Sequence, residues 1–542
     1  MKARSLIVVA AWPLLLAIGC DQQHKSVHSP SPEAQAEDIA SSPDLAPPPP
    51  GKTDNASTAK RAASADTTDV SGEGYAHIEE NRFLAVKQSP LSTFSIDVDA
   101  ASYSNVRRFL NQGMLPPPGA VRIEELVNYF DYDYPQPKSG DPFSVNTELS
   151  VCPWNSQHRL LLVGLQGRRV PVDDLPASNL VFLIDVSGSM DEPDKLPLVK
   201  GSLKLLTDQL REKDRVAIVV YAGNAGLVLS STGGSNKQKI KEAIDNLEAG
   251  GSTAGGAGLE LAYKIAAENF IPGGNNRVIL STDGDFNVGP SSDDALVSLI
   301  QEKRESGIFL SVLGYGTGNY QDEKMQQLAD KGNGNHYYID NEKEAQKVLV
   351  SEFGGTLFTI AKDVKIQVEF NPAAVQAYRL IGYEKRMLAA EDFNDDRKDA
   401  GELGSGHRVT ALYELIPAGT TDAYSPPVDA LRYQNAPATT VSSEWGTIKL
   451  RYKQPDGAIS QLLTHTVSED YVSVDRASAN LRFAASVAEF GMLLRNSAYK
   501  EGSSWQQVTG LAQSAADADG NGYRREFIGL TAKAAALAVT KR

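Results

Sequence analysis

Two hydrophobic patterns alternate through the middle of the chain, between residues 176 and 358. Short unbroken apolar runs are typical of strands buried on both faces, and apolar residues at helical spacing are typical of helices with one buried face. The expected strands are 180–184, 215–221, 227–230, 278–281 and 308–313. The expected helices are 196–210, 237–247, 256–270 and 293–305, with two more near residues 321 and 344. This order predicts an α/β domain in which a mostly parallel sheet carries helices on both faces.

A different pattern flanks this domain on both sides. Apolar and polar residues alternate there, which is typical of half-buried β structure. The stretches concerned are 143–151 and 159–165 before the domain, and 364–370, 409–415 and 448–452 after it. We predict one β-sandwich, built from residues 136–175 and 359–468, into which the central domain is inserted. Separate small sheets on either side are the alternative.

The two ends of the folded region have mixed and helical patterns. Residues 74–135 predict a small α+β segment with a strand at 93–98 and helices at 102–112 and 122–130. Residues 469–542 carry apolar residues at helical spacing and predict a helical region.

The chain begins with a short apolar stretch that follows two basic residues. This stretch, residues 6–18, is too short to span a bilayer comfortably and predicts an export signal over residues 1–19. It ends in Leu-Ala-Ile-Gly-Cys at Cys20, which resembles the lipobox of bacterial lipoproteins. That resemblance implies acylation of Cys20 and a membrane anchor, and an accidental cysteine is the alternative. Asp21 resembles the residue that keeps lipoproteins of enterobacteria-like envelopes in the inner membrane, which implies the periplasmic face of that membrane, with the outer membrane as the alternative.

Residues 20–73 are rich in Ser, Ala, Pro, Asp and Lys and cannot bury enough apolar surface to fold, so we predict a disordered tether. The whole chain of 542 residues has a formal net charge of −15 and lacks clusters of Lys and Arg, which argues against binding to nucleic acid. If Cys20 is acylated, Cys152 is the only other cysteine and no intramolecular disulfide forms. Cys152 is interpreted as a small core residue rather than a nucleophile.

Polar side chains gather in three loops that follow predicted strands of the central domain. Asp185, Ser187 and Ser189 form an Asp-x-Ser-x-Ser sequence directly after strand 180–184. Thr253 lies in a glycine-rich loop that opens a helix, and Asp283 follows strand 278–281. Ligands of open α/β sheets bind beyond the carboxyl ends of the strands, so these loops can converge on a divalent cation. Magnesium prefers an octahedral shell of about six oxygens, which hydroxyl groups and carboxylates supply.

Together the loops resemble the metal-ion-dependent adhesion site (MIDAS) of the von Willebrand factor type A (VWA) domain. The resemblance implies a Rossmann-like fold in which Ser187, Ser189 and Thr253 bind the ion directly, while Asp185 and Asp283 act wholly or partly through water. An ion held mainly by neutral hydroxyls keeps much of its positive charge and favours an anionic oxygen in its open position. Mg²⁺ or Mn²⁺ is favoured, and Ca²⁺ is the alternative.

Further segments resemble the YfbK type of bacterial VWA lipoprotein. These segments are 94–99, 101–103, 121–126, 379–384 and 521–524. The resemblance covers nearly everything after the tether, and it supports the architecture more than the biological role.

Several weaker patterns have simpler interpretations. Residues 517–522 open like a calcium-binding loop, but Ile528 stands where a bidentate glutamate is needed, so a turn between helices is preferred. Asp97 and Asp99 are better explained by capping of the next helix than by phosphatase chemistry. The scattered His336, His407 and His465 are interpreted as surface or packing residues.

The sequence therefore predicts a membrane-anchored, cation-dependent protein-binding module of the adhesion type, which captures an acidic side chain of an unknown protein partner. One alternative is a scaffold for envelope assembly, in which the ion only stiffens a loop. A second alternative is an enzyme. It is disfavoured because the chain has no His-Glu-x-x-His, no phosphate-binding Gly-x-x-x-x-Gly-Lys-Ser/Thr and no Gly-x-Ser-x-Gly sequence.

Overall fold

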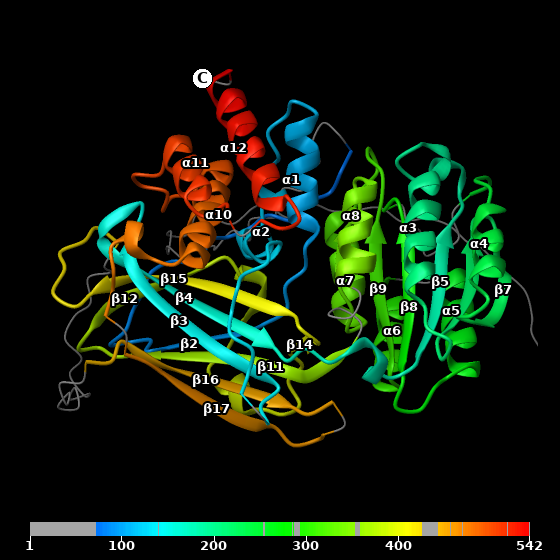
Figure 1. Ribbon diagram of the computed structural model, residues 1–542, viewed down its shortest axis with the longest axis horizontal. Coiled ribbons are helices and arrows are strands. Elements are labelled where there is room, and N and C mark those ends of the chain that lie inside the picture. The colour runs from blue at the N-terminus through cyan, green and yellow to red at the C-terminus, as the bar shows by residue number, and fades with distance from the viewer. Residues whose placement is uncertain are drawn as a thin grey trace, which may run out of the picture. The chain divides into compact units, whose positions relative to one another are not determined.

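The computed structural model describes residues 72–138, 140–252, 255–284, 286, 293–352, 358–424, 443–455, 457–468, 470–517 and 519–540. Within these residues the chain forms a central α/β domain, a β region of two sheets and a helical region (Figure 1). Over the same residues, no helix combines the length and the apolar character that crossing a bilayer requires.

A six-stranded sheet forms the middle of the α/β domain. In spatial order its strands are β10 (His336–Tyr338), β9 (Ile308–Gly314), β8 (Asn275–Thr282), β5 (Ser178–Asp185), β6 (Arg215–Tyr221) and β7 (Ala225–Gly233). All neighbours pair in parallel except β7, which runs antiparallel to β6 at the edge. The predicted mostly parallel sheet is confirmed, and β10 is a short strand that the apolar pattern did not predict.

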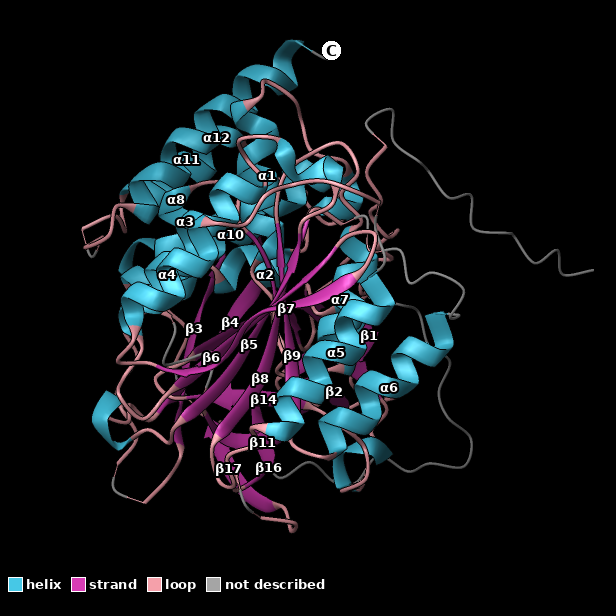
Figure 2. Ribbon diagram, turned by 90° about the vertical axis from the view of Figure 1, so that its right-hand side faces the viewer, coloured by secondary structure: helices cyan, strands magenta, loops and turns pink. Residues whose placement is uncertain are grey.

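Helices cover both faces of this sheet. Apolar residues of α3 (Leu196–Gln209), α4 (Lys237–Asp245) and α8 (Glu342–Gln346) share one core with the sheet. Residues of α5 (Gly255–Glu268), α6 (Asp293–Glu305) and α7 (Asp322–Lys331) share a second core. Figure 2 shows the two groups of helices on opposite sides of the strands. The predicted α/β fold is therefore confirmed.

The first sheet of the β region is antiparallel and contains strands from both sides of the central domain. Its order is β1 (Leu84–Ala85), β12 (Val375–Ile381), β15 (Arg408–Pro417), β4 (Asn155–Gly167) and β3 (Phe143–Cys152). β4 precedes the central domain and β15 follows it, yet the two pair along eight residues from Arg159 to Gln166. The central domain is thus inserted between two neighbouring strands of one sheet, which decides against separate small sheets.

The second sheet contains β13 (Met387–Leu388), β2 (Leu91–Ser95), β11 (Thr359–Phe370), β16 (Gly446–Lys453) and β17 (Gln461–Val467), with β14 (Gly401–Gly404) paired to β11. Apolar residues of both sheets form one core, as expected for a sandwich. The strand expected in the N-terminal segment is β2, which lies in this sheet between β13 and β11. It is therefore part of the sandwich, because its alternating residues complete a core that the later strands begin.

The helical region combines the two ends of the folded chain. Helices α1 (Ala101–Asn111) and α2 (Ile123–Asn128) share a core with α10 (Ala479–Arg495), α11 (Trp505–Gln513) and α12 (Tyr523–Thr540). The suspected calcium loop leads into α12, where the amide of Arg525 donates to Asp519 Oδ2 over 2.9 Å. This contact is typical of the start of a helix.

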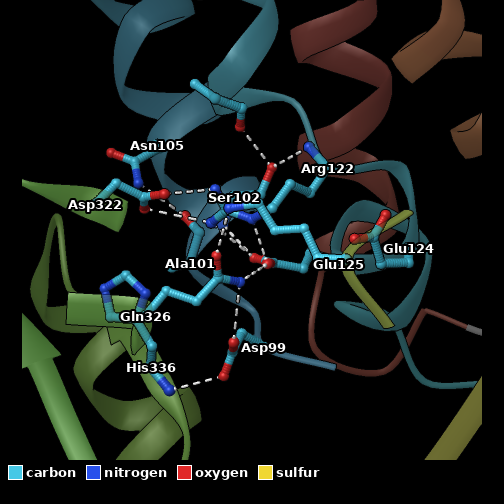
Figure 3. Close-up of polar contacts among 12 residues, drawn as sticks. Asp99, Ala101, Ser102, Asn105, Arg122, Glu124, Glu125, Asp322, Gln326 and His336 are labelled. Carbon is cyan, nitrogen blue, oxygen red and sulfur yellow. Dashed lines mark hydrogen bonds and ion pairs between the residues drawn. The ribbon is translucent and has the colours of Figure 1, made fainter. Parts of the chain in front are cut away.

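A buried group of charged residues joins the N-terminal segment to the central domain (Figure 3). Arg122, just before α2, forms ion pairs with Glu125 of that helix and with Asp322 at the start of α7. All three side chains are at most 2 % exposed. Gln326 of α7 donates to Asp99 Oδ2 over 3.4 Å. Removal of one member of such a cluster leaves its partners as buried charges without compensation.

Residues 72–74, which we term the strap, lie against the loop that precedes α7. The amide of Gly74 donates to the carbonyl of Tyr320 over 3.0 Å, and Glu73 Oε1 accepts from the amide of Gly318 over 3.1 Å. Glu73 also pairs with Arg108 of α1 at 2.7 Å and is 2 % exposed. The strap therefore fixes the loop at residues 316–321 from one side.

Candidate metal centre

The predicted first metal loop follows the end of β5. Asp185 is the last residue of the strand and is fully buried, while Ser187 and Ser189 lie on the turn that follows. The amide of Ser187 donates to Asp185 Oδ1 over 2.9 Å, and the two serine hydroxyls lie 3.2 Å apart. Ser189 is exposed, whereas Ser187 is buried. Two neutral oxygens are thus gathered between a buried carboxylate and the surface.

Asp185 is held only by neutral groups among the contacts of the described residues. The Tyr221 hydroxyl donates to its Oδ2 over 3.1 Å, and the Thr282 hydroxyl lies 3.3 Å from the same atom. Burial raises the pKa of Asp185 to about 6, the hydrogen bonds from Ser187 oppose this rise, and the charge of Asp283 adds to it. A buried carboxylate without a cationic partner is the type of group that a bound cation stabilises. The donor set therefore fits a divalent ion.

Asp283 lies one residue beyond β8, the strand next to β5. Ile184 pairs with Ser281, so Asp185 and Asp283 follow neighbouring strands at the same edge of the sheet. Asp283 Oδ2 accepts from Lys195 Nζ and from Asn319 Nδ2, both over 2.9 Å.

The pKa values of the two aspartates move in opposite directions. Burial alone would raise the pKa of Asp283, but hydrogen bonds from Asn319, Lys195 and Ser189 outweigh it and hold the pKa below its ordinary value. Both aspartates are buried. The ammonium group of Lys195 compensates the charge of Asp283, whereas the contacts of Asp185 described above are with neutral groups. Among the described residues, the cationic partner of this pair of aspartates thus lies on Asp283, and Asp185 has neutral partners only.

The second predicted loop approaches the first through its backbone. The amide of Gly250 donates to the carbonyl of Val186 over 2.7 Å, and the amide of Gly188 donates to the carbonyl of Gly251 over 3.0 Å. Gly251 has a φ of +85°, and a Cβ there would lie 3.3 Å from the amide nitrogen of Gly223. Thr253, the ligand predicted from this loop, lies outside the described residues.

The structure brings together Asp185, Ser187, Ser189 and Asp283 and adds two residues that the sequence reasoning missed. Lys195, directly before α3, and Asn319, in the loop before α7, both donate hydrogen bonds to Asp283. The only available signal for Lys195 was its position, as a single basic residue at the end of an acidic loop. Asn319 carried no signal, because it lies 36 residues from its partner.

The other candidate residues have structural surroundings. Cys152 is a buried free thiol, and burial raises its pKa well above the ordinary value, so it is a poor nucleophile. His336 is buried with its Nε2 3.0 Å from the Tyr320 hydroxyl, and His465 Nε2 lies 3.0 Å from the Thr147 hydroxyl. In the described part of the chain, no three His, Cys, Asp or Glu side chains form a group that could hold a metal.

A second buried polar cluster lies in the sandwich and was also missed. His158 Nδ1 is 2.6 Å from Glu414 Oε1, and its Nε2 is 3.0 Å from Asp422 Oδ2. Burial would lower the pKa of His158, but hydrogen bonds and charge from both carboxylates outweigh it and raise the pKa. Arg379 pairs with the other oxygen of Glu414 at 2.7 Å. This cluster balances its own charges and shows no group free for chemistry.

Three family models match successive parts of the chain. Residues 179–352 match the von Willebrand factor type A domain, and residues 69–162 match a model described as von Willebrand factor. Residues 355–537 match the model described as uncharacterized protein YfbK, C-terminal. Two solved structures resemble this chain at TM-scores of 0.38 and 0.36. The first is von Willebrand factor type A from Catenulispora acidiphila, which is 15 % identical, and the match covers 83 % of this chain and 91 % of that one. The second is the ArnB paralog VWA2 from Sulfolobus acidocaldarius, which is 13 % identical, and the match covers 73 % of this chain and 98 % of that one.

Two curated relatives share parts of this architecture. Uncharacterized protein sll0103 from Synechocystis is 31 % identical over 33 % of this chain and 40 % of its own length. Uncharacterized protein YfbK from Escherichia coli is 48 % identical over 493 residues, which cover 89 % of this chain and 84 % of that protein. A VWA domain is in general a protein-interaction module. With this identity over most of both chains, the protein belongs to the YfbK family of proteins that contain a von Willebrand factor type A domain.

Proposed function

We propose that the protein is a cation-dependent adhesion module that binds an acidic side chain of a partner protein at the edge of the central sheet. Ser187, Ser189 and Thr253 would hold Mg²⁺ or Mn²⁺ directly, with Ca²⁺ as the alternative. Asp185 and Asp283 would support the ion from behind, and the ion would supply an electrophilic position for a carboxylate. The observation that carries the proposal is the buried Asp185, which accepts from the hydroxyls of Tyr221 and Thr282 and, among the described residues, has neutral donors only.

The chain's own residues prepare this site in two ways. The turn after β5 gathers two hydroxyls, which are weak donors and leave most of the charge on a bound ion. Ser189 is exposed and Asp185 is buried, so the ion would lie between the interior and solvent and could accept a ligand from outside. Residues that bind, orient and expose a cation suit recognition, so we propose a binding protein rather than an enzyme.

The place of action in this proposal is the cell envelope. Acylation of Cys20 would attach the chain to a membrane, on the periplasmic face of the inner membrane according to Asp21, with the outer membrane as the alternative. The acidic balance of the chain suits a partner reached through a cation rather than nucleic acid.

Asp185→Ala in the full-length protein tests this function. We expect the variant to lose partner crosslinking in cells and to lose the heat signal of Mg²⁺ or Mn²⁺ binding by calorimetry, because the ion loses its supporting charge. Asp191→Ala is the matched control. Asp191 lies exposed on the same turn, so its removal should leave capture and metal binding unchanged.

Two results would count against the proposal. Capture that persists in chelator would favour the envelope scaffold, in which the ion only stiffens a loop. Equal affinity of the wild type and of Asp185→Ala for the metal would show that Asp185 does not support a metal site.

A further inference from the structure

His158 of β4 lies between two carboxylates, one on a strand and one on a loop. Its Nδ1 is 2.6 Å from Oε1 of Glu414 on β15, and its Nε2 is 3.0 Å from Oδ2 of Asp422, in the loop that follows β15. The ring is fully buried and packs edge-on against Phe83. An imidazole carries a proton on both nitrogens only when it is charged, and here both nitrogens face a carboxylate oxygen. The arrangement therefore fits the imidazolium form.

The charges in this cluster balance only when His158 is charged. Arg379 of β12 pairs with the other oxygen of Glu414 at 2.7 Å, so two cations then meet two carboxylates. The thiol of Cys152 on β3 lies 4.0 Å from Glu414 Oε1. It adds no charge, because burial holds its pKa well above the ordinary value.

A neutral ring would keep one N–H and gain one lone pair. The N–H belongs with Glu414, because that side chain is 1 % exposed and fixed by Arg379. The lone pair then falls on Nε2, where it repels the carboxylate of Asp422 and accepts from Asn155 Nδ2, 3.3 Å away. Asn155 also donates over 2.7 Å to Glu501, which is exposed. Asp422 is therefore the partner that a neutral ring would lose.

Asp422 orders the loop segment 422–424, which we term the latch. Its Oδ1 accepts from the amide of Tyr424 over 2.7 Å, so the same carboxylate shapes the segment and binds it to the ring. The residues before the latch are held separately, since Gln376 Nε2 donates to the carbonyl of Thr420 over 3.1 Å. Loss of the contact with the ring would thus free the latch and leave the end of β15 in place.

We propose that protonation of His158 controls this latch: the charged ring binds Asp422 and holds residues 422–424, and the neutral ring releases them. Burial alone would lower the pKa of His158, but hydrogen bonds and charge from Glu414 and Asp422 raise it above the ordinary 6.5. The released state binds the proton less tightly. The latch is therefore held below about pH 6.5 and is lost as the pH rises through the raised pKa.

Hydrogen exchange of the full-length protein, followed by mass spectrometry between pH 6 and 9, tests the proposal. The exchange of peptides that contain residues 422–424, scaled to the intrinsic rate at each pH, measures opening of the latch. We expect the scaled rate to rise about tenfold or more, because the opening equilibrium changes tenfold for each unit by which the pKa is raised. Peptides from β4 and β15 are the internal reference, since a change in overall stability would affect them as well.

Two variants separate the proposed switch from other effects of pH. Asp422→Asn keeps the acceptor for the amide of Tyr424 but removes the charge, and an amide can meet either form of the ring, so the rise should disappear. His158→Gln cannot take up a proton and should exchange at pH 6 as fast as the wild type does at pH 9. His465→Gln is the matched control. His465 lies in the same sandwich and faces the Thr147 hydroxyl, so the wild-type rise should persist.

Three results would overturn the inference. They are a constant scaled rate in the wild type from pH 6 to 9, a rise that survives in Asp422→Asn, and an equal rise in the reference strands. If His158→Gln fails to fold, Asp422→Asn decides the question, because it changes one loop side chain without changing its shape. The latch includes no residue of the metal centre, so these results leave the proposed function untouched.

Discussion

The Lys195 side chain shows how strongly one contact depends on a residue that takes no part in it. The ammonium group reaches Asp283 only because Gly316 leaves room for the stem. Gly318, two residues later, also has a positive φ, of +91°, but its Cβ position has no neighbour within 4 Å. Both glycines therefore have a positive φ, but only Gly316 is closely packed against a neighbouring side chain.

This pair gives a prediction at the scale of single residues. Gly316→Ala and Gly318→Ala should both cost about 1 kcal/mol for the left-handed backbone, and Gly316→Ala should cost about 1–3 kcal/mol more because the stem of Lys195 must move. Urea denaturation in chelator measures the difference. Equal losses of unfolding free energy in the two variants would contradict tight packing of the Lys195 side chain against Gly316.

At the scale of elements, the contact between α2 and α7 rests on a buried ion pair. Arg122 reaches Asp322 at 2.5 Å and is 2 % exposed, and its charge lowers the pKa of that aspartate, which burial alone would raise. The pair joins residues 200 positions apart. Removal of the guanidinium would leave Asp322 and Glu125 buried without a cationic partner.

We expect Arg122→Met to lower the free energy of unfolding by about 3–5 kcal/mol, since one partner of a buried pair is removed. The exposed pair of Lys241 with Asp208 is the reference, and Lys241→Met should cost at most about 1 kcal/mol. Chemical denaturation of both variants checks this. A similarly small loss of unfolding free energy in both variants would mean that the buried ion pair contributes little to the contact between α2 and α7.

The periodicity of apolar residues predicted most helices and strands, because each element buries its own face. It also predicted the insertion, since matching alternation stood on both sides of the α/β domain. It could not predict which sheet β2 joins, because strand pairing is a long-range choice among similar edges. For the same reason the loop 185–189 could be recognised as a candidate from five consecutive residues. Lys195 and Asn319, in contrast, come close to Asp283 only in the folded chain.

At the scale of the whole molecule, several buried carboxyl groups favour their protonated form. Burial raises the pKa of Asp99 to about 6 and the pKa values of Glu124 and Glu489 to about 7. The folded protein therefore binds these protons more tightly than the unfolded chain does. Their contribution to stability is fully present near pH 4 and is lost as the pH rises through 6 and 7.

The opposite sign holds for Asp322 and Glu414, whose pKa values are lowered. Burial alone would raise both values, but Arg122 acts on Asp322, and Arg379 together with His158 acts on Glu414. Their contribution is present at neutral pH and is lost as the pH falls below about 4. Stability should therefore be highest between about pH 4 and 6.

Glu489→Gln tests this dependence at one site. Glu489 Oε1 accepts from the amide of Ser504 over 3.1 Å, and its Oε2 has no partner among the described residues. A neutral amide should raise the free energy of unfolding at pH 8 by about 1–3 kcal/mol and leave it nearly unchanged at pH 5. Denaturation at both pH values in chelator measures this, with the exposed Glu248→Gln as control. A gain of the same size at both pH values would assign the effect to packing.

The strap gives the molecule a mechanical property. Any tension that travels along the chain to Gly72 is shared by the hydrogen bonds of Gly72 with Gln321, of Gly74 with Tyr320 and of Glu73 with Gly318, and by the ion pair of Glu73 with Arg108 of α1. Gly74 and Gln321 form a parallel bridge. Asn319 lies between Gly318 and Tyr320 and hydrogen-bonds Asp283, so a pull on the strap would act on the edge of the central sheet as well as on α1.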